Sequence, residues 1–281
     1  MNKVVGIGKF ASLVADEMGK HPEYTIYKFT EDSASPDTFA LGSLPDMKHY
    51  EEEIPLEEIK LFMRSISDTD GVLAIVEGGN PMSGATLQIL KTIKDSDLHV
   101  LYLIPDMDMV SSEEKSYHKI CFGILQEYAR SGVFKNLYII DRPKAEEMVG
   151  DVPVSEYERS VANFISYTVA MVNYFSNTGA VLENKISKND WCNISSFGLA
   201  SFDNNLVSDL FSLENIENIH FYYGIPETTL SQDSTLIKKI KSHVKNQKSN
   251  DQTISYSVYS TTFDRTMILA QAFTSTVQTL S

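Results

Sequence analysis

The chain has 281 residues, a formal net charge of −14 and 42% hydrophobic residues. The excess of acids argues against a nucleic-acid partner, because proteins bind duplexes largely through cations that neutralise phosphates. The sequence has no run of about 18 apolar residues, so we expect no membrane span. The N-terminus also lacks a signal peptide's apolar stretch, and we therefore expect a soluble cytoplasmic protein without a direct membrane anchor. Two cysteines and six scattered histidines predict neither a disulfide framework nor a metal site.

The first half of the chain alternates strand patterns with helix patterns. Strands are predicted at 4–8, 24–29, 71–76, 99–104 and 136–140, most of them as continuous apolar runs. Helices are predicted at 10–18, 56–66, 85–95 and 111–132, with Ser111 or Ser112 as N-cap of the last and Gly132 as its stop. The polar, acidic segment 31–55 is interpreted as a long loop with one helical turn. This alternation is typical of an α/β fold with a Rossmann-like parallel sheet.

The second half has a different character. A long helix is predicted at 154–175, since Ser155 and Glu158 have the spacing of a capping box and apolar residues recur at three- and four-residue steps. Further strands are predicted at 194–202, 219–223 and 254–261, and a basic helix at 236–248. We therefore predict a nucleotide-binding-like domain at 1–153, a central connecting helix at 154–177 and a smaller α+β domain at 178–281.

Two predicted strands end in glycine turns that lead into helices. The first turn contains Gly6 and Gly8, and the second contains Gly78, Gly79, Ser83 and Gly84. Ligands of such sheets bind at the carboxyl ends of the strands, where glycine lets the backbone approach a phosphate and the helix start offers free N–H groups. A single Gly-x-Gly turn also occurs simply to tighten a connection, so the second, richer turn is the stronger indication of a ligand.

The stretch GVLAIVEGGNPMSGATLQILKTI resembles the signature strand, glycine-rich phosphate loop and following helix of the tubulin/FtsZ family. The order of the predicted elements is also similar over most of the chain. The resemblance implies a GTP or GDP site with Mg²⁺, and head-to-tail self-association into filaments. It places Gly6, Gly8, Gly78, Gly79, Ser83 and Gly84 around the phosphates. Glu113 or Glu114 would then contact the ribose, and Asn163 the base.

The chain departs from the family pattern in two loops. Asn80, Pro81 and Met82 interrupt the phosphate loop, and proline has no N–H to donate. In the loop after the long helix, Asn189 and Cys192 take the places of the family's catalytic acids, which leaves Asp190 as the candidate catalytic residue. Because general-base catalysis contributes roughly 10²–10⁴-fold, we expect weak or absent GTPase activity. Asp190 serves equally well as a helix cap.

Three functions remain open from the sequence. The first is a tubulin/FtsZ-like filament protein with a degenerate GTP site. The second is a non-polymerising Rossmann-like nucleotide-binding protein or enzyme, in which Glu31 or Asp32 would hold a ribose. The third is a structural or regulatory protein without bound nucleotide that assembles with a related active homologue. Lysines on the basic helix form either a solvated face or a dock for an acidic surface of the next subunit: Lys238, Lys239, Lys241, Lys245 and Lys248.

Overall fold

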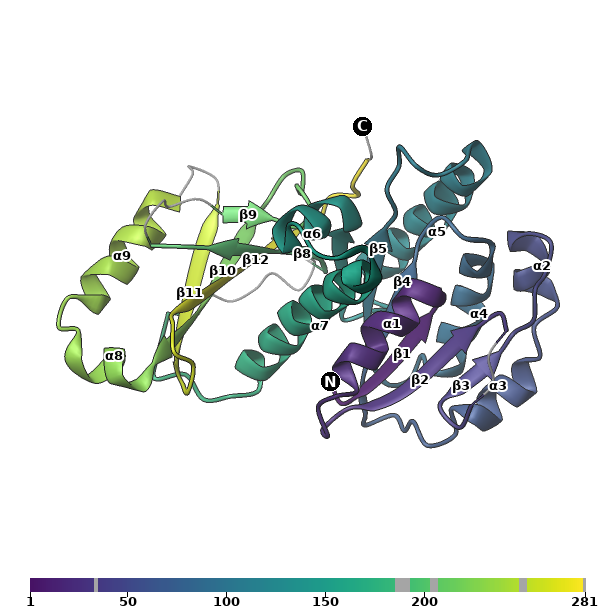
Figure 1. Ribbon diagram of the computed structural model, residues 1–281, viewed down its shortest axis with the longest axis horizontal. Helices are drawn as coiled ribbons and strands as arrows, with labels where there is room; N and C mark the ends of the chain where they lie inside the picture. Colours follow the sequence, from purple (N-terminus) through teal and green to yellow (C-terminus); the bar gives the residue numbers. More distant parts are fainter. Residues whose placement is uncertain (33–34, 185–192, 203–206, 248–251, 280–281) are drawn as a thin grey trace. The chain divides into compact units, whose positions relative to one another are not determined.

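The computed structural model of the protein describes residues 1–32, 35–184, 193–202, 207–247 and 252–279 (Figure 1). The chain divides into two compact units, Met1–Tyr167 and Thr168–Ser281, which we call unit 1 and unit 2. The division falls within a helix. The domain boundaries expected at 153 and 177 stay predictions.

Unit 1 contains a parallel sheet. Its strands are β1 (Lys3–Ile7), β2 (Thr25–Thr30), β3 (Thr38–Ala40), β4 (Gly71–Glu77), β5 (Asp97–Ile104) and β6 (Asn136–Asp141). Their order across the sheet is β3-β2-β1-β4-β5-β6, and each neighbouring pair runs parallel. The middle strands β1, β4 and β5 are buried along most of their length, which is why they read as continuous apolar runs.

Helices connect these strands. They are α1 (Lys9–Met18), α2 (Met47–Glu52), α3 (Leu56–Phe62), the 3₁₀ turn η1 (Pro81–Ala85), α4 (Thr86–Thr92), α5 (Ser112–Arg130), α6 (Arg142–Val149), η2 (Val154–Glu156) and α7 (Tyr157–Ser176). Right-handed crossovers with this strand order put α1 on one face of the sheet and α4 and α5 on the other (Figure 1). No helix among the described residues is long and apolar enough to cross a membrane.

Helix α5 shows how local sequence sets one of these boundaries. The Ser111 hydroxyl accepts from the Glu114 amide at 3.2 Å, and the Ser111 amide donates to the Glu114 carboxylate at 2.7 Å. This capping box satisfies two backbone N–H groups that the helix itself leaves free. The helix ends at Arg130, and Gly132 then takes a φ of 77°. Both the predicted cap and the predicted stop are confirmed.

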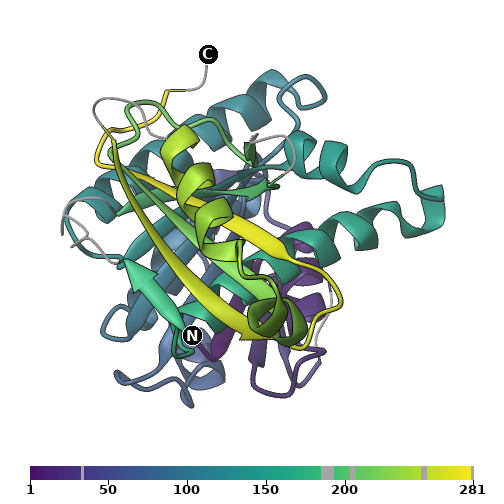
Figure 2. The same ribbon diagram turned by 90° about the vertical axis from the view of Figure 1, so that its left-hand side faces the viewer.

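Unit 2 is built on a mixed sheet. Its strands are β7 (Leu182–Asn184), β8 (Ile194–Ala200), β9 (Val207–Asp209), β10 (Asn218–Pro226), β11 (Thr253–Thr261) and β12 (Met267–Thr274). Their order is β8-β12-β10-β11-β7, with β9 beside β8, and only β10 and β11 pair in parallel. Helices α8 (Glu227–Gln232) and α9 (Leu236–Gln247) cover one face of this sheet (Figure 2).

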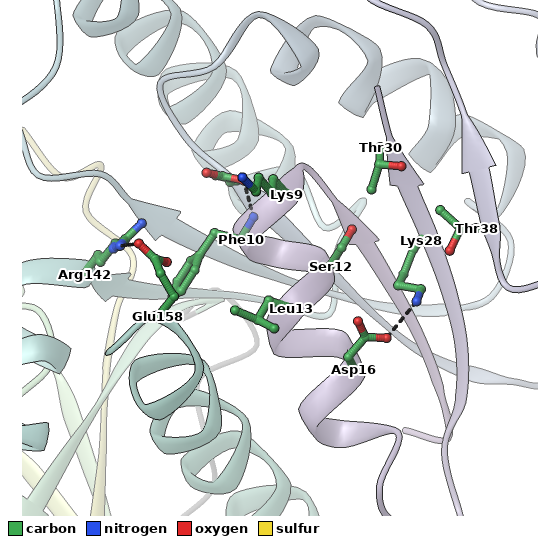
Figure 3. A pocket seen from close by; sticks show the side chains of 11 residues that line it. Lys9, Phe10, Ser12, Leu13, Asp16, Lys28, Thr30, Thr38, Arg142 and Glu158 are labelled. Carbon is green, nitrogen blue, oxygen red and sulfur yellow. Dashed lines mark hydrogen bonds and ion pairs between the residues drawn. The ribbon is translucent and has the colours of Figure 1, made fainter. Parts of the chain in front are cut away.

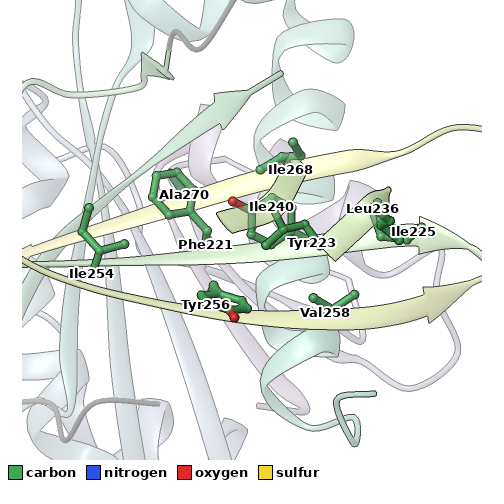
Figure 4. Close-up of a cluster of buried hydrophobic side chains, with 10 residues drawn as sticks. All are labelled: Phe221, Tyr223, Ile225, Leu236, Ile240, Ile254, Tyr256, Val258, Ile268 and Ala270. Atoms are coloured by element: carbon green, nitrogen blue, oxygen red, sulfur yellow. The ribbon is translucent and has the colours of Figure 1, made fainter. Parts of the chain in front are cut away.

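The core of unit 2 follows from the alternation of side chains along β10. Phe221, Tyr223 and Ile225 point to the α9 face, where they join Leu236 and Ile240 in a buried cluster (Figure 4). The intervening Tyr222 points to the opposite face and stacks on Phe175 at the end of α7, with ring centroids 6.1 Å apart. Unit 2 is therefore an α+β unit with apolar side chains on both faces of its sheet.

Several elements were not predicted. The segment expected to be a long loop with one helical turn contains the unpredicted strand β3, and the short helix α2 takes the place of that turn. The short helices α6 and α8 and the strand β12 were also missed. The predicted helix 56–66 ends earlier, at Phe62. The α/β fold with a parallel sheet, a long helix and a smaller α+β part is confirmed.

Candidate functional site

The first glycine corner joins β1 to α1. Gly8 takes a φ of 106°, a left-handed conformation that other residues rarely adopt. Gly6 lies under the helix, and a Cβ built there would come 2.9 Å from the Cα of Ser12. The backbone conformation of the turn thus requires glycine at position 8, and the close approach of strand and helix requires it at position 6.

Glu77 meets this corner from the neighbouring strand. Ile7 pairs with Val76, so the next residues, Gly8 and Glu77, emerge side by side at the carboxyl edge of the sheet. The amide of Phe10, in the first turn of α1, donates to Oε2 of Glu77 at 2.8 Å. The carboxylate therefore lies at the positive end of the helix dipole, where an anion is stabilised.

The partly buried position of Glu77 affects its protonation. Burial raises the pKa of its carboxyl above the usual range, because desolvation disfavours the charged form. The amides of Phe10 and Ala11 and the positive charge of Arg142 act in the opposite direction. The residue is held in place by contacts that favour its anionic form.

The second glycine corner begins at Gly78 and Gly79. The Gly78 amide donates to the carbonyl of Leu103 at 2.9 Å, and a Cβ at Gly78 would overlap the hydroxyl of Tyr102. Gly79 takes a φ of 79°, and a Cβ there would lie 3.0 Å from Cγ of Pro105. Packing against β5 and the following loop therefore accounts for these two glycines.

The rest of this corner forms the buried turn η1. The Ser83 hydroxyl donates to the carbonyl of Asn80 at 2.8 Å, and the Ser83 amide donates to the same oxygen at 3.1 Å. Met82 and Ser83 are 2% and 3% exposed. A Cβ at Gly84 would overlap the carbonyl oxygen of Met47. Helix α2 thus lies directly on the turn and covers it.

The acids predicted to contact a ribose lie at the start of α5. Glu114 forms the capping box with Ser111, and Glu113 accepts a hydrogen bond from the hydroxyl of Tyr117. The backbone oxygen of Glu114 lies 3.7 Å from a Cβ built on Gly79. The structure therefore brings the start of α5 next to the second glycine corner, while both carboxylates already have partners.

The other predicted residues are placed differently. Asn163 is exposed on α7, where its backbone oxygen accepts from the hydroxyl of Ser166 at 2.9 Å. Asp190, with Asn189 and Cys192, lies outside the described residues. The described site residues that meet are thus those of the two corners and the α5 start.

A cavity of about 450 Å³ lies beside the first corner (Figure 3). Its lining comes from α1, β2, β3, the end of β4 and the starts of α6 and α7: Lys9, Phe10, Ser12, Leu13, Asp16, Lys28, Thr30, Thr38, Glu77, Arg142 and Glu158. None of the nine predicted site residues that the structure describes belongs to this lining. Glu77 both contacts the first glycine corner and lines the cavity, and it was not among the residues predicted from the sequence.

The charges around the cavity are largely paired with one another. Lys28 Nζ lies 2.7 Å from Asp16, and Arg142 donates to Glu158 at 2.6 Å. The Arg142 guanidinium also lies 4.2 Å from the ring centroid of Phe10, a cation–π distance. Lys28 and Arg142 therefore already have anionic partners, whereas Lys9, which also lines the cavity, makes no ion pair with the described residues.

A buried polar cluster behind η1 was also missed by sequence analysis. The hydroxyl of Tyr102 lies 2.9 Å from Nδ1 of His118, and burial lowers the pKa of that imidazole to about 4. Burial raises the pKa of the Cys121 thiol to about 12, so this cysteine is not an activated nucleophile. Spacing alone could not reveal the cluster, because its members come from β5 and α5.

Comparison with known proteins shows similarity at the level of structure. No family model matches the sequence, and no curated protein matches it. A GTPγS-form protofilament of TubZ from Bacillus thuringiensis serovar israelensis superimposes with a TM-score of 0.71 at 12% identity, covering 98% of this chain and 86% of TubZ. An empty FtsZ dimer from M. jannaschii gives 0.67 at 14% identity, covering 96% and 87%. CetZ2 from Haloferax volcanii, a GTPγS-bound protofilament, gives 0.69 at 12% identity, covering 97% and 92%.

The chain has the tubulin/FtsZ fold. The resemblance suspected from the glycine-rich stretch is thereby confirmed for the architecture. The roles predicted for individual residues stay predictions.

At the corners of this tubulin/FtsZ fold, two polar groups that a phosphate would need are engaged by the chain itself in the conformation described. The Phe10 amide, which a phosphate would use, donates to Glu77. In the second corner the Ser83 hydroxyl is engaged within the turn, and Pro81 has no N–H. The Phe10 amide and the Ser83 hydroxyl are therefore already bonded within the chain, whereas the buried Ser12 Oγ and Asn80 Oδ1 at these corners have no hydrogen-bond partner among the described residues.

Proposed function

We propose that this chain is a divergent tubulin/FtsZ-like filament subunit that associates head to tail and carries a degenerate GTP site. The observation that carries the proposal is the match over 98% of the chain to a TubZ structure described as a protofilament. FtsZ and CetZ2 structures of the same fold are described as a dimer and a protofilament. Self-association is the property that these proteins share.

The charge distribution supports contact between unlike surfaces of successive copies. Unit 1 has a formal net charge of −12, and unit 2 has a formal net charge of −2. Helix α9 in unit 2 carries four lysines and no acid. A basic face on one copy and an acidic face on the next form a heterologous contact, which propagates as an open filament when the rotation does not close.

The corner geometry supports a degenerate site. In this proposal Gly6, Gly8, Gly78, Gly79, Ser83 and Gly84 mark the former phosphate positions, Glu113 and Glu114 the ribose side, and Asn163 the base side. Their present contacts are intramolecular packing and capping. Asp190 is the remaining candidate for a catalytic acid, so the chain is at most a weak GTPase.

Sedimentation and negative-stain electron microscopy of the purified chain test the filament proposal. Polymers should form as protein concentration rises and should weaken with salt, since exposed charges are screened over about 8 Å at 0.15 M. The double variant Lys238→Glu/Lys241→Glu should raise the critical concentration. The matched control is Lys91→Glu/Lys94→Glu in unit 1, which should leave the critical concentration for assembly unchanged. A chain that stays monomeric at high concentration, with and without GTP, would overturn the proposal.

A second function is favoured by the contact between Phe10 and Glu77. A chain whose phosphate corner is filled by its own carboxylate suits a nucleotide-free partner that assembles with a related active homologue. A ligand present at 100 times its Kd stabilises a protein by roughly 2.7 kcal/mol. A melting curve that GTP does not change, together with co-sedimentation only with such a homologue, would select this function over self-assembly.

A further inference from the structure

We propose that Glu77 is an internal substitute for a bound phosphate, and that its carboxylate closes the start of α1 to nucleoside triphosphates. The inference deepens the proposed function and rests on it for the class of ligand excluded. It assigns a role to a residue at the end of β4 that lies outside both glycine turns.

The first argument is the use of the α1 amides. The start of a helix leaves backbone N–H groups without partners, and these are the groups that hold phosphates. Here Gly8 donates to the carbonyl of Phe29 at 3.1 Å, and Ser12 donates to Gly8 at 2.9 Å. The Phe10 amide between them donates to Glu77 at 2.8 Å. The carboxylate therefore takes the donor that an incoming phosphate oxygen would need.

The second argument is space. A Cβ built on Gly8 would lie 2.6 Å from Oε2 of Glu77, 2.9 Å from its Cβ and 3.1 Å from Nδ2 of Asn80. The Glu77 and Asn80 side chains therefore occupy the space next to the Gly8 backbone, and a ligand would have to displace Glu77 to approach it. The glycine that would allow close approach of a ligand instead allows close approach of a side chain.

The third argument is charge. Arg142, which contributes a positive charge near Glu77, is itself bonded to Glu146 and Glu158. A phosphate entering beside Glu77 would place a second anion within a few ångströms of the first, and like charges at that distance repel. Glu77 and a phosphate are therefore alternatives at the start of α1.

The strand register fixes this arrangement. β1 and β4 are parallel, and Gly6 pairs with Ile75 while Ile7 pairs with Val76. The position after Val76 is thereby held beside the position after Ile7. An acid at residue 77 reaches the helix start from the strand itself, without a mobile loop.

The test is a gain of binding in Glu77→Ala. GTPγS and inorganic pyrophosphate are the two probes, measured by isothermal titration calorimetry with the chain below its assembly concentration. A hydrogen bond to a charged group is worth roughly 1.5–3 kcal/mol. Freeing the Phe10 amide should therefore tighten binding of GTPγS at least about tenfold relative to wild type. Glu77→Ala should also bind pyrophosphate more tightly than wild type does. Because pyrophosphate has no base, this result distinguishes phosphate recognition from base recognition.

The matched control is Glu158→Ala, which removes a carboxylate from the same cavity without freeing an α1 amide. It should tighten binding of both probes much less than Glu77→Ala does, because Arg142 keeps Glu146 as its partner. If both variants bound the probes equally more tightly than wild type, the change in net charge would explain the result and the proposal would be overturned. Wild type that binds GTPγS as tightly as Glu77→Ala would also overturn it.

A second variant covers the case in which Glu77→Ala does not fold. Glu77→Gln keeps an acceptor oxygen for Phe10 but removes the negative charge, so a smaller gain in pyrophosphate binding is expected. No gain in a folded variant at residue 77 overturns the proposal. Because binding is measured on the unassembled chain, this result is independent of whether filaments form.

Discussion

Arg159 on α7 donates through Nε to Oε1 of Glu17 on α1 at 2.9 Å. The two residues are 142 positions apart, and the side chain of Glu17 is only 1% exposed. Lys20 also donates to this carboxylate. Burying a carboxylate is costly unless cations and hydrogen bonds compensate it. The contact therefore fixes the first half of α7 against α1, beside the cavity that Glu77 lines.

The first prediction concerns this pair. Arg159→Met should lower the free energy of unfolding by about 1–2 kcal/mol, because it removes a charged hydrogen bond while Lys20 still compensates Glu17. The double variant Arg159→Met/Glu17→Leu should be no less stable than Arg159→Met, since it also removes the buried charge. Urea unfolding followed by circular dichroism measures both. A single variant as stable as wild type would contradict the role given to the contact.

The sequence predicted those elements whose pattern is local. Strands such as β4 and β5 are long apolar runs, and α5 carries its capping box and its stop within the helix and its flanks. The missed elements lack such signals. β3 has three residues, and α6 buries only Ala145, so neither shows a periodic apolar face. Their conformation depends on the sheet edge and on tertiary contacts.

The location of the two glycine corners was predicted, whereas the contact between Glu77 and the Phe10 amide was not. The glycines marked the carboxyl edge of the sheet, where β1 and β4 do end together. Glycine spacing cannot distinguish a ligand from packing, and Gly6, Gly78 and Gly84 are all held by close backbone or side-chain neighbours. The role of Glu77 depends on pairing between strands about seventy residues apart, which no local motif reveals.

The second prediction concerns Phe175 at the end of α7. Its ring is fully buried and stacks on Tyr259 with centroids 4.6 Å apart. Phe175→Ala should lower the free energy of unfolding by about 3–5 kcal/mol, the usual cost of removing a core aromatic ring. The neighbouring Tyr174 is 52% exposed, so Tyr174→Ala should cost less than about 0.5 kcal/mol. Equal costs in urea unfolding would show that Phe175 is not a core residue.

The third prediction concerns Asp141, at the junction of β6 and α6. Burial raises the pKa of its carboxyl to about 6, and its side chain makes no capping hydrogen bond to α6. The folded state therefore holds the proton more tightly than the unfolded state, and the contribution to stability falls as pH rises from about 4 to about 6. Asp141→Asn should raise the melting temperature relative to wild type at pH 7.5 but not at pH 4.

The control for this prediction is Asp95→Asn, a change at an exposed carboxyl. It should shift the melting temperature little at either pH. A gain for Asp141→Asn of the same size at pH 4 and pH 7.5 would mean that ionisation of Asp141 is not its cause. Differential scanning fluorimetry across this range gives the comparison directly.

The last prediction concerns His118, whose Nδ1 faces the hydroxyl of Tyr102 and whose ring stacks on Phe122 with centroids 5.3 Å apart. Burial lowers the pKa of the imidazole to about 4. The unfolded chain therefore takes up the proton first, and stability is lost as pH falls from about 6.5 towards about 4. His118→Gln does not titrate. It should be less stable than wild type at pH 7.5, because it loses the ring contacts, and this gap should narrow at pH 5.

Thermal unfolding of both proteins at the two pH values measures that gap, with His21→Gln, a change at an exposed histidine, as the control. His21→Gln should show no such convergence. A gap between wild type and His118→Gln that keeps its size from pH 7.5 to pH 5 would mean that the imidazole is not the group that makes this core sensitive to acid. Convergence would instead identify protonation of His118, between β5 and α5, as one cause of the acid sensitivity of unit 1.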